Sequence, residues 1–161
     1  GGGGLNPGFA AYGLLKSLPV PLHTHNSSNV ESIAVLMYLA GQRRTAADYS
    51  RFTFHPLHWG TGNGIVDHAR MAEWVTSLDF DRERYCAIFR EATQGAQVPL
   101  DIEECLRDRA KIIGATTAAT HGITTAALGA DGLEASVASM CAGEVHVLPR
   151  ENVVHWWVNG F

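Results

Sequence analysis

The chain has 161 residues, of which 46% are hydrophobic and 17% are charged, and its formal net charge is -4. This composition is that of one globular domain with its own core, and it excludes an intrinsically disordered chain. The 12 basic and 16 acidic residues provide no basic excess for a nucleic-acid partner. No apolar run is long enough for a membrane-spanning helix and no signal peptide opens the sequence, so we expect a cytoplasmic protein.

The cysteines and histidines are the residues of this sequence with the side chains that most often bind transition metals. The three cysteines are odd in number and widely spaced: Cys86, Cys105 and Cys141. This pattern predicts buried free thiols and not a disulfide framework or a zinc site. Two pairs of the eight histidines have ligand-like spacing: His23 with His25, and His55 with His58. No cluster of cysteines or carboxylates completes either pair, so we expect polar surface histidines, no metal and no cofactor.

The first predicted helix follows four glycines, Gly1 to Gly4. Such a run serves either as a flexible linker or as backbone that approaches a ligand closely. Asn6 as the cap and Pro7 at the first helical position predict where the helix begins. Its apolar residues recur at helical spacing: Ala11, Leu14, Leu15 and Leu18. We expect a short strand from Pro19 to Thr24 and then a turn from His25 to Ser28.

A serine and a histidine follow in surroundings that suit nucleophilic catalysis. Ser32 opens an apolar helix that closes at Gly41, and His55 ends a short strand predicted from the alternation of residues 51–54, with a polar loop between. Free backbone N–H groups at a helix start stabilise a developing anion, and a histidine can activate a serine hydroxyl. The structural alternative is that Ser32 is only an N-cap and that His55 is only packed against its neighbours.

The remainder of the chain has mainly helical patterns. A long helix is predicted from Ile65 to Ala92, with a break in its charged middle, Asp79 to Glu83. Pro99 and Asp101 predict the start of another helix. The further elements that we expect are a helical turn at 115–121 closed by Gly122, a last helix around 133–141, and strands at 145–148 and 153–158. This order of elements indicates an α/β fold.

Six motifs in a fixed order relate the sequence to a known family. They are Gly2-Gly3 with Gly8 and Tyr12, Ser32 with the helix ending Leu39-Ala40-Gly41, Ser50-Arg51 before the strand that ends at His55-Pro56, His68-Ala69-Arg70, Arg107-Asp108-Arg109, and His121-Gly122-Ile123. Together they resemble the Clp protease proteolytic subunit, the ClpP family of the ClpP/crotonase fold. The resemblance covers about residues 2–124. It divides the chain into a core, 1–125, and a C-terminal extension, 126–161, that has no counterpart in the family.

The resemblance implies a ClpP/crotonase-like α/β fold of repeated β-β-α units with a protruding handle helix. It also implies a serine endopeptidase that cleaves peptides or unfolded proteins. Members of the family self-associate into stacked rings, often fed by an AAA+ ATPase unfoldase, because enclosure of the catalytic sites supplies specificity. We therefore expect ring assembly, peptide substrates and an ATPase partner, with no nucleic acid and no membrane.

The resemblance also implies the roles of five residues. Ser32 would attack the peptide carbonyl, His55 would act as base and then as acid, and Asp108 would orient the imidazole of His55. The oxyanion hole would come from the backbone N–H groups of Gly3 and Ile33, and donors of this kind are worth about 3–4 kcal/mol of barrier each. Gly3 would be a glycine because its backbone has to come close to the reacting group.

The sequence departs from the family pattern in several places. Glu31 stands where the family has a small residue, and its carboxylate either stabilises an imidazolium or blocks the pocket. Ala34 stands where the family has glycine, and the long helix carries an insertion around 78–84. The segment from Asp108 to Gly122 is longer than the family pattern. Asp101 or a neighbouring glutamate is therefore an alternative to Asp108 as the third member of the Ser-His-Asp triad. The family has N-terminal strands ahead of the glycine pair at which this sequence begins.

Two other functions fit the same patterns. The first is a catalytically inactive ring subunit or scaffold, which would keep the fold and the assembly surfaces without the chemistry. The second is a crotonase-type acyl-CoA enzyme, which shares the fold and a glycine-rich oxyanion hole but needs no serine–histidine pair. The acid/base glutamates of that second class are not evident in this sequence.

Overall fold

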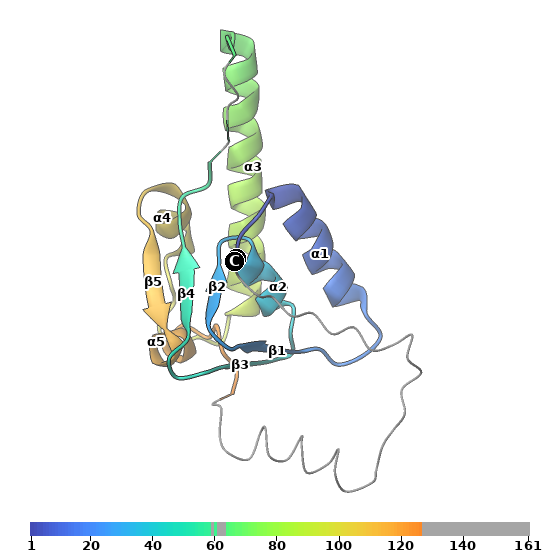
Figure 1. Cartoon of the computed structure of the whole chain (residues 1–161), viewed down its shortest axis with the longest axis vertical. Coiled ribbons are helices and arrows are strands. Elements are labelled where there is room, and N and C mark those ends of the chain that lie inside the picture. Colours follow the sequence, from blue (N-terminus) through green and yellow to red (C-terminus); the bar gives the residue numbers. More distant parts are fainter. Residues whose placement is uncertain (59, 61–63, 127–161) are drawn as a thin grey trace, which may run out of the picture.

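The computed structural model describes residues 1–58, 60 and 64–126, and it has a mixed α/β fold (Figure 1). The elements in chain order are α1 (Leu5–Ser17), β1 (His23–Asn26), β2 (Asn29–Glu31), α2 (Ala34–Leu39), β3 (Arg43–Ala46), β4 (Arg51–Phe54), α3 (His68–Ala92), α4 (Ile102–Arg107), β5 (Lys111–Gly114) and α5 (Ala115–Thr120). The predicted last helix, the two predicted C-terminal strands and Cys141 lie outside the described residues, as does the extension beyond residue 126.

Two consecutive β-β-α units form the centre of the fold. The first unit is β1, β2 and α2, and the second is β3, β4 and α3. Equivalent strands pair in parallel: β1 with β3 in one sheet, and β2 with β4 in another, which β5 extends in the antiparallel direction. Parallel pairing brings the carboxyl ends of β2 and β4 to the same edge of their sheet.

One face of the β2-β4-β5 sheet supplies much of the core. Phe52 and Phe54 of β4 and Ile113 of β5 are buried on this face, and the rings of Phe54 and Phe89 of α3 meet edge to face. The opposite face carries Arg51, which is exposed. This alternation is what a sheet with one packed face and one solvated face requires. It confirms the strand predicted for residues 51–54.

Helix α1 begins earlier than predicted. Its N-cap is Gly4, so Asn6 is not the cap and Pro7 is not the first helical residue. Gly8 lies against the start of α2: a Cβ built there would clash with Ile33 Cγ1. Glycine at this position therefore allows α1 to pack directly on the start of α2.

Helix α3 is continuous from His68 to Ala92, so the predicted break at 79–83 is wrong. Arg82 and Glu83 are good helix formers, and the charged side chains pair along the helix, Asp79 with Arg82 and Asp81 with Arg84. The buried residues of α3 all lie in its second half, and its first half projects beyond the other elements (Figure 1).

Three short strands were not predicted: β2, β3 and β5. The segment from Arg43 to Ala46 lies in the predicted polar loop, but it forms a strand that pairs residue by residue with β1. The strand predicted from Pro19 to Thr24 begins only at His23 and continues through residues assigned to a turn. The structure confirms the helix predicted to start near Pro99 and Asp101, because Asp101 is the N-cap of α4. It also confirms the helical turn closed by Gly122, which follows α5 with a positive φ of 67°.

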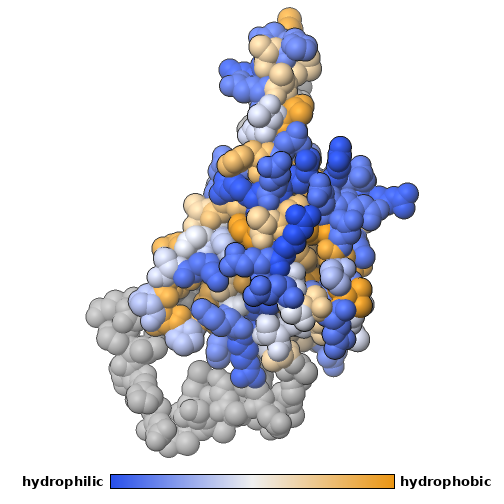
Figure 2. All heavy atoms as spheres, turned by 180° about the vertical axis from the view of Figure 1, so that it is seen from behind, coloured by the Kyte–Doolittle hydropathy of each residue, from blue (hydrophilic) through white to orange (hydrophobic). Residues whose placement is uncertain are grey.

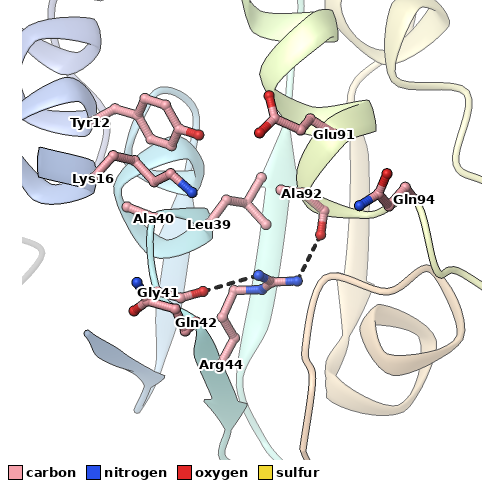
Figure 3. A pocket seen from close by; sticks show the side chains of 10 residues that line it. All are labelled: Tyr12, Lys16, Leu39, Ala40, Gly41, Gln42, Arg44, Glu91, Ala92 and Gln94. Carbon is pink, nitrogen blue, oxygen red and sulfur yellow. Dashed lines mark hydrogen bonds between the residues drawn. The ribbon is translucent and has the colours of Figure 1, made fainter. Parts of the chain in front are cut away.

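Arg44 of β3 is buried and joins the ends of three helices. Its Nε donates to Ile123 O (2.8 Å), Nη1 donates to Gly41 O (3.0 Å), and Nη2 donates to Ala92 O (2.8 Å) and Gly122 O (3.1 Å). Two of these bonds are drawn in Figure 3. The four carbonyls lie at or just after the C-terminal ends of α2, α3 and α5. Helix C-termini leave carbonyls unpaired and carry partial negative charge, so a cation is favourable there.

The far side of the molecule is mostly hydrophilic, with apolar patches between the polar side chains (Figure 2). Met71, Val75 and Phe80 of α3 are among the exposed large apolar residues. Within the described residues, no helix combines the length and the apolar character that crossing a membrane would require.

The packing of α1 predicts opposite effects for two glycine substitutions in that helix. Gly8→Ala places a methyl group into Ile33 and should lower the free energy of unfolding by about 1–3 kcal/mol. Gly13→Ala is the matched control, since nothing lies within 4 Å of its Cβ position. It should raise stability by about 0.5–1 kcal/mol through helix propensity. Urea unfolding of both variants tests this, and equal effects would contradict the packing described.

Arg44 predicts a second stability difference. Arg44→Lys keeps the charge but loses the planar fork that reaches four carbonyls, so we expect a loss of about 2–3 kcal/mol. Arg43→Lys, at the exposed neighbouring position, should change stability by less than about 0.5 kcal/mol. Thermal and urea unfolding measure both, and similar small values for the two variants would refute the role given to Arg44.

Candidate functional site

Ser32 and His55 lie at the ends of adjacent parallel strands. Ser32 follows the last residue of β2, and His55 follows the last residue of β4. The N–H of Ser32 donates to Thr53 O (2.9 Å), which continues the pairing of Glu31 with Thr53 by one step. Because neighbouring strands are about 4.8 Å apart, this register brings the backbones of the two residues to within about 6 Å. The prediction that the fold brings them together is consistent with this placement.

Ser32 has a strained backbone. Its φ is 56°, and among the described residues it is the one non-glycine residue with positive φ. The left-handed conformation costs about 1–2 kcal/mol for a residue with a Cβ. Such strain persists where surrounding contacts impose it, and it is concentrated at functional sites. Surrounding contacts therefore hold the turn between β2 and α2 in a conformation that serine at position 32 does not favour by itself.

The hydroxyl of Ser32 is not used to cap α2. The N-cap of that helix is Ile33, and the helix has no side-chain capping bond. The Ser32 hydroxyl makes no hydrogen bond with any described residue. The structural alternative, a serine that serves only as an N-cap, is therefore wrong.

Two donors hold the carbonyl of Ser32. Tyr85 Oη of α3 donates to Ser32 O at 3.0 Å, and the Val35 N–H donates to the same oxygen at 3.1 Å. Tyr85 is fully buried, and burial raises the pKa of its hydroxyl far above the usual value, so the group stays protonated as a donor. These contacts hold the turn from α2 and α3.

Gly2 is the glycine that lies against Ser32. A Cβ at Gly2 would come within 2.8 Å of Ser32 Cβ and 3.2 Å of Ser32 Oγ, whereas a Cβ at Gly3 would meet nothing within 4 Å. We predicted that position 3 is a glycine because its backbone comes close to the reacting group. In the structure, it is Gly2 that lies close to Ser32. The role of the Gly3 N–H in an oxyanion hole stays a prediction. The other predicted donor, the Ile33 N–H, has no acceptor among the described residues.

His55 has the tautomer that a general base needs. Its Nδ1 lies 2.9 Å from Pro56 O, and a carbonyl oxygen can only accept, so Nδ1 carries the proton. Nε2 is then left with its lone pair and has no partner among the described residues. The ring of His58 lies 5.6 Å away, centroid to centroid. In a catalytic triad a carboxylate usually holds Nδ1, and here a backbone carbonyl does so.

Asp108 lies near this region but does not bind His55. It is the exposed C-cap of α4, and its N–H donates to Glu104 O (2.9 Å). The Leu57 N–H donates to Leu106 O (3.0 Å), so the chain just before Asp108 runs beside the chain just after His55. Within the part of the chain that the structure describes, no carboxylate hydrogen-bonds or ion-pairs with His55.

The alternative carboxylates separate into two groups. Asp101 caps α4 through the Glu104 N–H (3.0 Å), and Glu103 pairs with Arg90. Glu104 and Asp108 are exposed and have no cation within ion-pair distance among the described residues. These two are the carboxylates of the region that remain free for His55.

Glu31 is paired with Arg51. The two side chains lie 3.6 Å apart, and their residues belong to neighbouring strands, β2 and β4. The arginine compensates the charge next to Ser32, at a partly exposed position where such a pair adds little stability. The carboxylate of Glu31 has its own partner and is not left free beside the nucleophile.

Other chemistries find little support at the described positions. No group of three His, Cys, Asp or Glu side chains there is arranged to hold a metal ion. Cys86 and Cys105 are buried free thiols, as predicted, and burial raises the pKa of both. A cavity of about 220 Å³ opens beside Arg44 between α1, α2 and α3 (Figure 3). It lies at the C-terminal end of α2, whereas Ser32 precedes the N-terminal end.

No protein-family model matches the chain, and no curated protein matches it.

The strain at Ser32 predicts an unusual order of stability. Ser32→Gly removes the cost of positive φ, whereas Ser32→Ala keeps it, so the glycine variant should be the more stable by about 1 kcal/mol. At Ser77, an exposed helical position in α3, the order should be reversed, with alanine better by about 1 kcal/mol. Urea unfolding of the four variants tests this, and the same order at both positions would show that Ser32 is not strained.

Proposed function

We propose that this chain is a ClpP-like serine endopeptidase in which Ser32 is the nucleophile. The observation that carries the proposal is the strained, uncapped Ser32 at a strand end beside the strand that delivers His55. A nucleophile on a sharp turn from a strand into a helix exposes its hydroxyl and places helix-start N–H groups beside it. The same turn is thus suited to both attack and stabilisation of the oxyanion.

The reaction proceeds in two stages. Ser32 Oγ forms a bond to the carbonyl carbon of the peptide, and His55 Nε2 takes the hydroxyl proton. His55 then gives this proton to the leaving amine as the C–N bond breaks, which leaves an acyl-enzyme. Water attacks the acyl-enzyme, again with His55 as base, and releases the acid and free Ser32. The N–H groups of Gly3 and Ile33 would bind the oxyanion in both stages.

Asp108 is proposed as the group that stabilises the His55 imidazolium, with Glu104 as the alternative. Both carboxylates are exposed and uncommitted, and a change of rotamer or a small movement of the loop after α4 is needed for contact. In the free protein, the Pro56 carbonyl already keeps His55 in the tautomer required for the first step. Catalytic hydrogen bonds often tighten only when substrate binds.

The ClpP/crotonase-like fold, and with it ring assembly fed by an AAA+ ATPase, belongs to the same proposal. Two features support it: the pair of β-β-α units in which equivalent strands are neighbours, and the projecting first half of α3. A likeness of fold alone does not fix an activity. The proposal of an endopeptidase therefore depends on Ser32 and His55.

A catalytically inactive ring subunit is the second candidate. The observation that favours it is that no described carboxylate hydrogen-bonds or ion-pairs with His55. A subunit that kept the fold for assembly would tolerate such an incomplete site. A crotonase-type enzyme has no comparable observation in its favour.

Labelling with a fluorophosphonate separates the two candidates. We expect intact mass spectrometry to show one adduct on the wild-type protein, none on Ser32→Ala and strongly reduced labelling of His55→Ala. Ser28→Ala, in the exposed turn before β2, is the matched control and should label normally. Absence of an adduct on folded wild-type protein would favour the inactive subunit.

The same assay tests which carboxylate, Asp108 or Glu104, stabilises the His55 imidazolium. Asp108→Asn should slow labelling by more than about 100-fold if its carboxylate stabilises the imidazolium, and Glu104→Gln should leave the rate unchanged. The reverse result would assign the role to Glu104. If neither substitution slows labelling, the site works as a dyad, and the triad assignment is wrong.

A further inference from the structure

The cavity of about 220 Å³ between α1, α2 and α3 is lined by polar side chains that face one another. Tyr12 and Lys16 of α1 point into it from one side, and Glu91 of α3 points toward them from the other (Figure 3). The guanidinium of Arg44 also borders the cavity. Ligand pockets for drug-sized molecules occupy about 300–1,000 Å³, so this cavity is suited to a smaller molecule.

Arg44 has one N–H group without an acceptor among the described residues. A guanidinium carries five N–H groups. Four of them donate to the helix-terminal carbonyls described above: one on Nε, one on Nη1 and two on Nη2. The second N–H of Nη1 remains. Arg44 is 7% exposed, so bulk water reaches this group poorly, and a negatively charged ligand in the cavity that accepts from it gains a charge-assisted hydrogen bond.

The charged groups at the rim of the cavity are also uncommitted. Lys16 and Glu91 are exposed, and within the described part of the chain neither side chain has an ion-pair partner or a hydrogen bond. The hydroxyl of Tyr12 likewise has no hydrogen-bond partner there. Burial and the nearby Glu91 carboxylate raise the pKa of this hydroxyl, so it stays protonated as a donor. The cavity therefore offers donors and positive charge on one side and a carboxylate on the other.

We propose that this cavity binds a free amino acid in its zwitterionic form. The carboxylate of the ligand accepts hydrogen bonds from Lys16, from the Tyr12 hydroxyl and from the remaining N–H of Arg44. The ammonium group of the ligand donates to Glu91. A ligand with only a negative charge meets repulsion from Glu91, and one with only a positive charge meets repulsion from Lys16 and Arg44. A free amino acid carries both charges in a small molecule.

This inference stands apart from the proposed peptidase function. The cavity lies at the C-terminal ends of α2 and α3, and neither Ser32 nor His55 lines it. Binding of an amino acid here therefore requires no activity at Ser32, and the two proposals fail or stand separately.

Isothermal titration calorimetry at neutral pH with three small probes tests the inference. The probes are L-alanine, N-acetyl-L-alanine, which keeps the carboxylate but has no ammonium group, and ethylamine, which keeps the ammonium group but has no carboxylate. We expect L-alanine to bind with saturation and each analogue to bind at least about tenfold more weakly, because each leaves a charged partner in the cavity unpaired. No binding of L-alanine, or equal binding of all three probes, would overturn the inference.

Variants then locate the binding site. Glu91→Gln and Lys16→Gln each remove one rim charge and should weaken L-alanine binding by about tenfold or more. The matched controls are Glu83→Gln, on the same helix as Glu91, and Lys111→Gln in β5, since both residues are exposed and neither lines the cavity. Both controls should bind L-alanine as the wild-type protein does. Unchanged affinity in Glu91→Gln and Lys16→Gln would show that L-alanine binds elsewhere and would refute the assignment to this cavity.

Thermal unfolding gives a second measurement that does not depend on the heat of binding. A ligand that binds only the folded protein raises its Tm. At a concentration that saturates the wild-type protein, L-alanine should raise the Tm of the wild type and of Glu83→Gln more than that of Glu91→Gln. The substituted positions are exposed, so the variants should fold as the wild type does. An equal rise in Glu91→Gln would contradict the role given to Glu91.

Discussion

The fold depends on one buried cation. Arg44 donates to carbonyls that end or follow three helices, and these carbonyls come from residues 41, 92, 122 and 123, which are distant in sequence. A neutral side chain at this point would leave several helix-terminal carbonyls without donors in a buried place. The guanidinium therefore connects the first β-β-α unit, the long helix and the C-terminal end of the described chain. It lies in β3, where it pairs with Thr24 of β1 in the smaller sheet.

The backbone of Ser32, in the candidate site, is likewise held by contacts from several elements. Ser32 keeps an unfavourable backbone conformation because α2, which follows it, is packed between α1 and the core, and because groups from β4 and α3 bind its amide and carbonyl. Each of these contacts comes from a different element. The local sequence offers no glycine or asparagine at position 32 that would adopt positive φ without help. The strain is thus imposed by tertiary structure and gives the hydroxyl its free position.

Sequence reasoning found the elements whose signals are local. The alternation of β4, the Asp101 cap of α4 and the glycine after α5 are patterns that a few adjacent residues determine. It missed β3 because buried Arg44 looks polar in sequence, and its acceptors become visible only when distant carbonyls are placed around it. The predicted break in α3 fell on charged residues that in fact pair along the helix, Asp79 with Arg82 and Asp81 with Arg84.

Only part of the candidate site could be predicted, again because some of its features depend on residues that are distant in sequence. The resemblance pointed to Ser32 and His55, and the parallel register places them at adjacent strand ends. The close glycine proved to be Gly2 and not Gly3, because a shift of one residue changes which backbone atom faces the serine. The hydrogen bond between His55 and the Pro56 carbonyl carries no sequence signal, since it depends on how the imidazole ring is placed in three dimensions.

The pairing of Ser32 with β4 also has a consequence for how the protein is made. The amide of Ser32 is held by the carbonyl of Thr53, which a ribosome adds 21 residues later, and its carbonyl is held by Tyr85, later still. Parallel strands cannot pair until the connection between them has been completed. A nascent chain that has exposed Ser32 but not yet β4 or α3 therefore lacks the contacts that impose the turn. The serine acquires its geometry only after most of the described domain has been synthesised, which delays any reactivity until the fold around it exists.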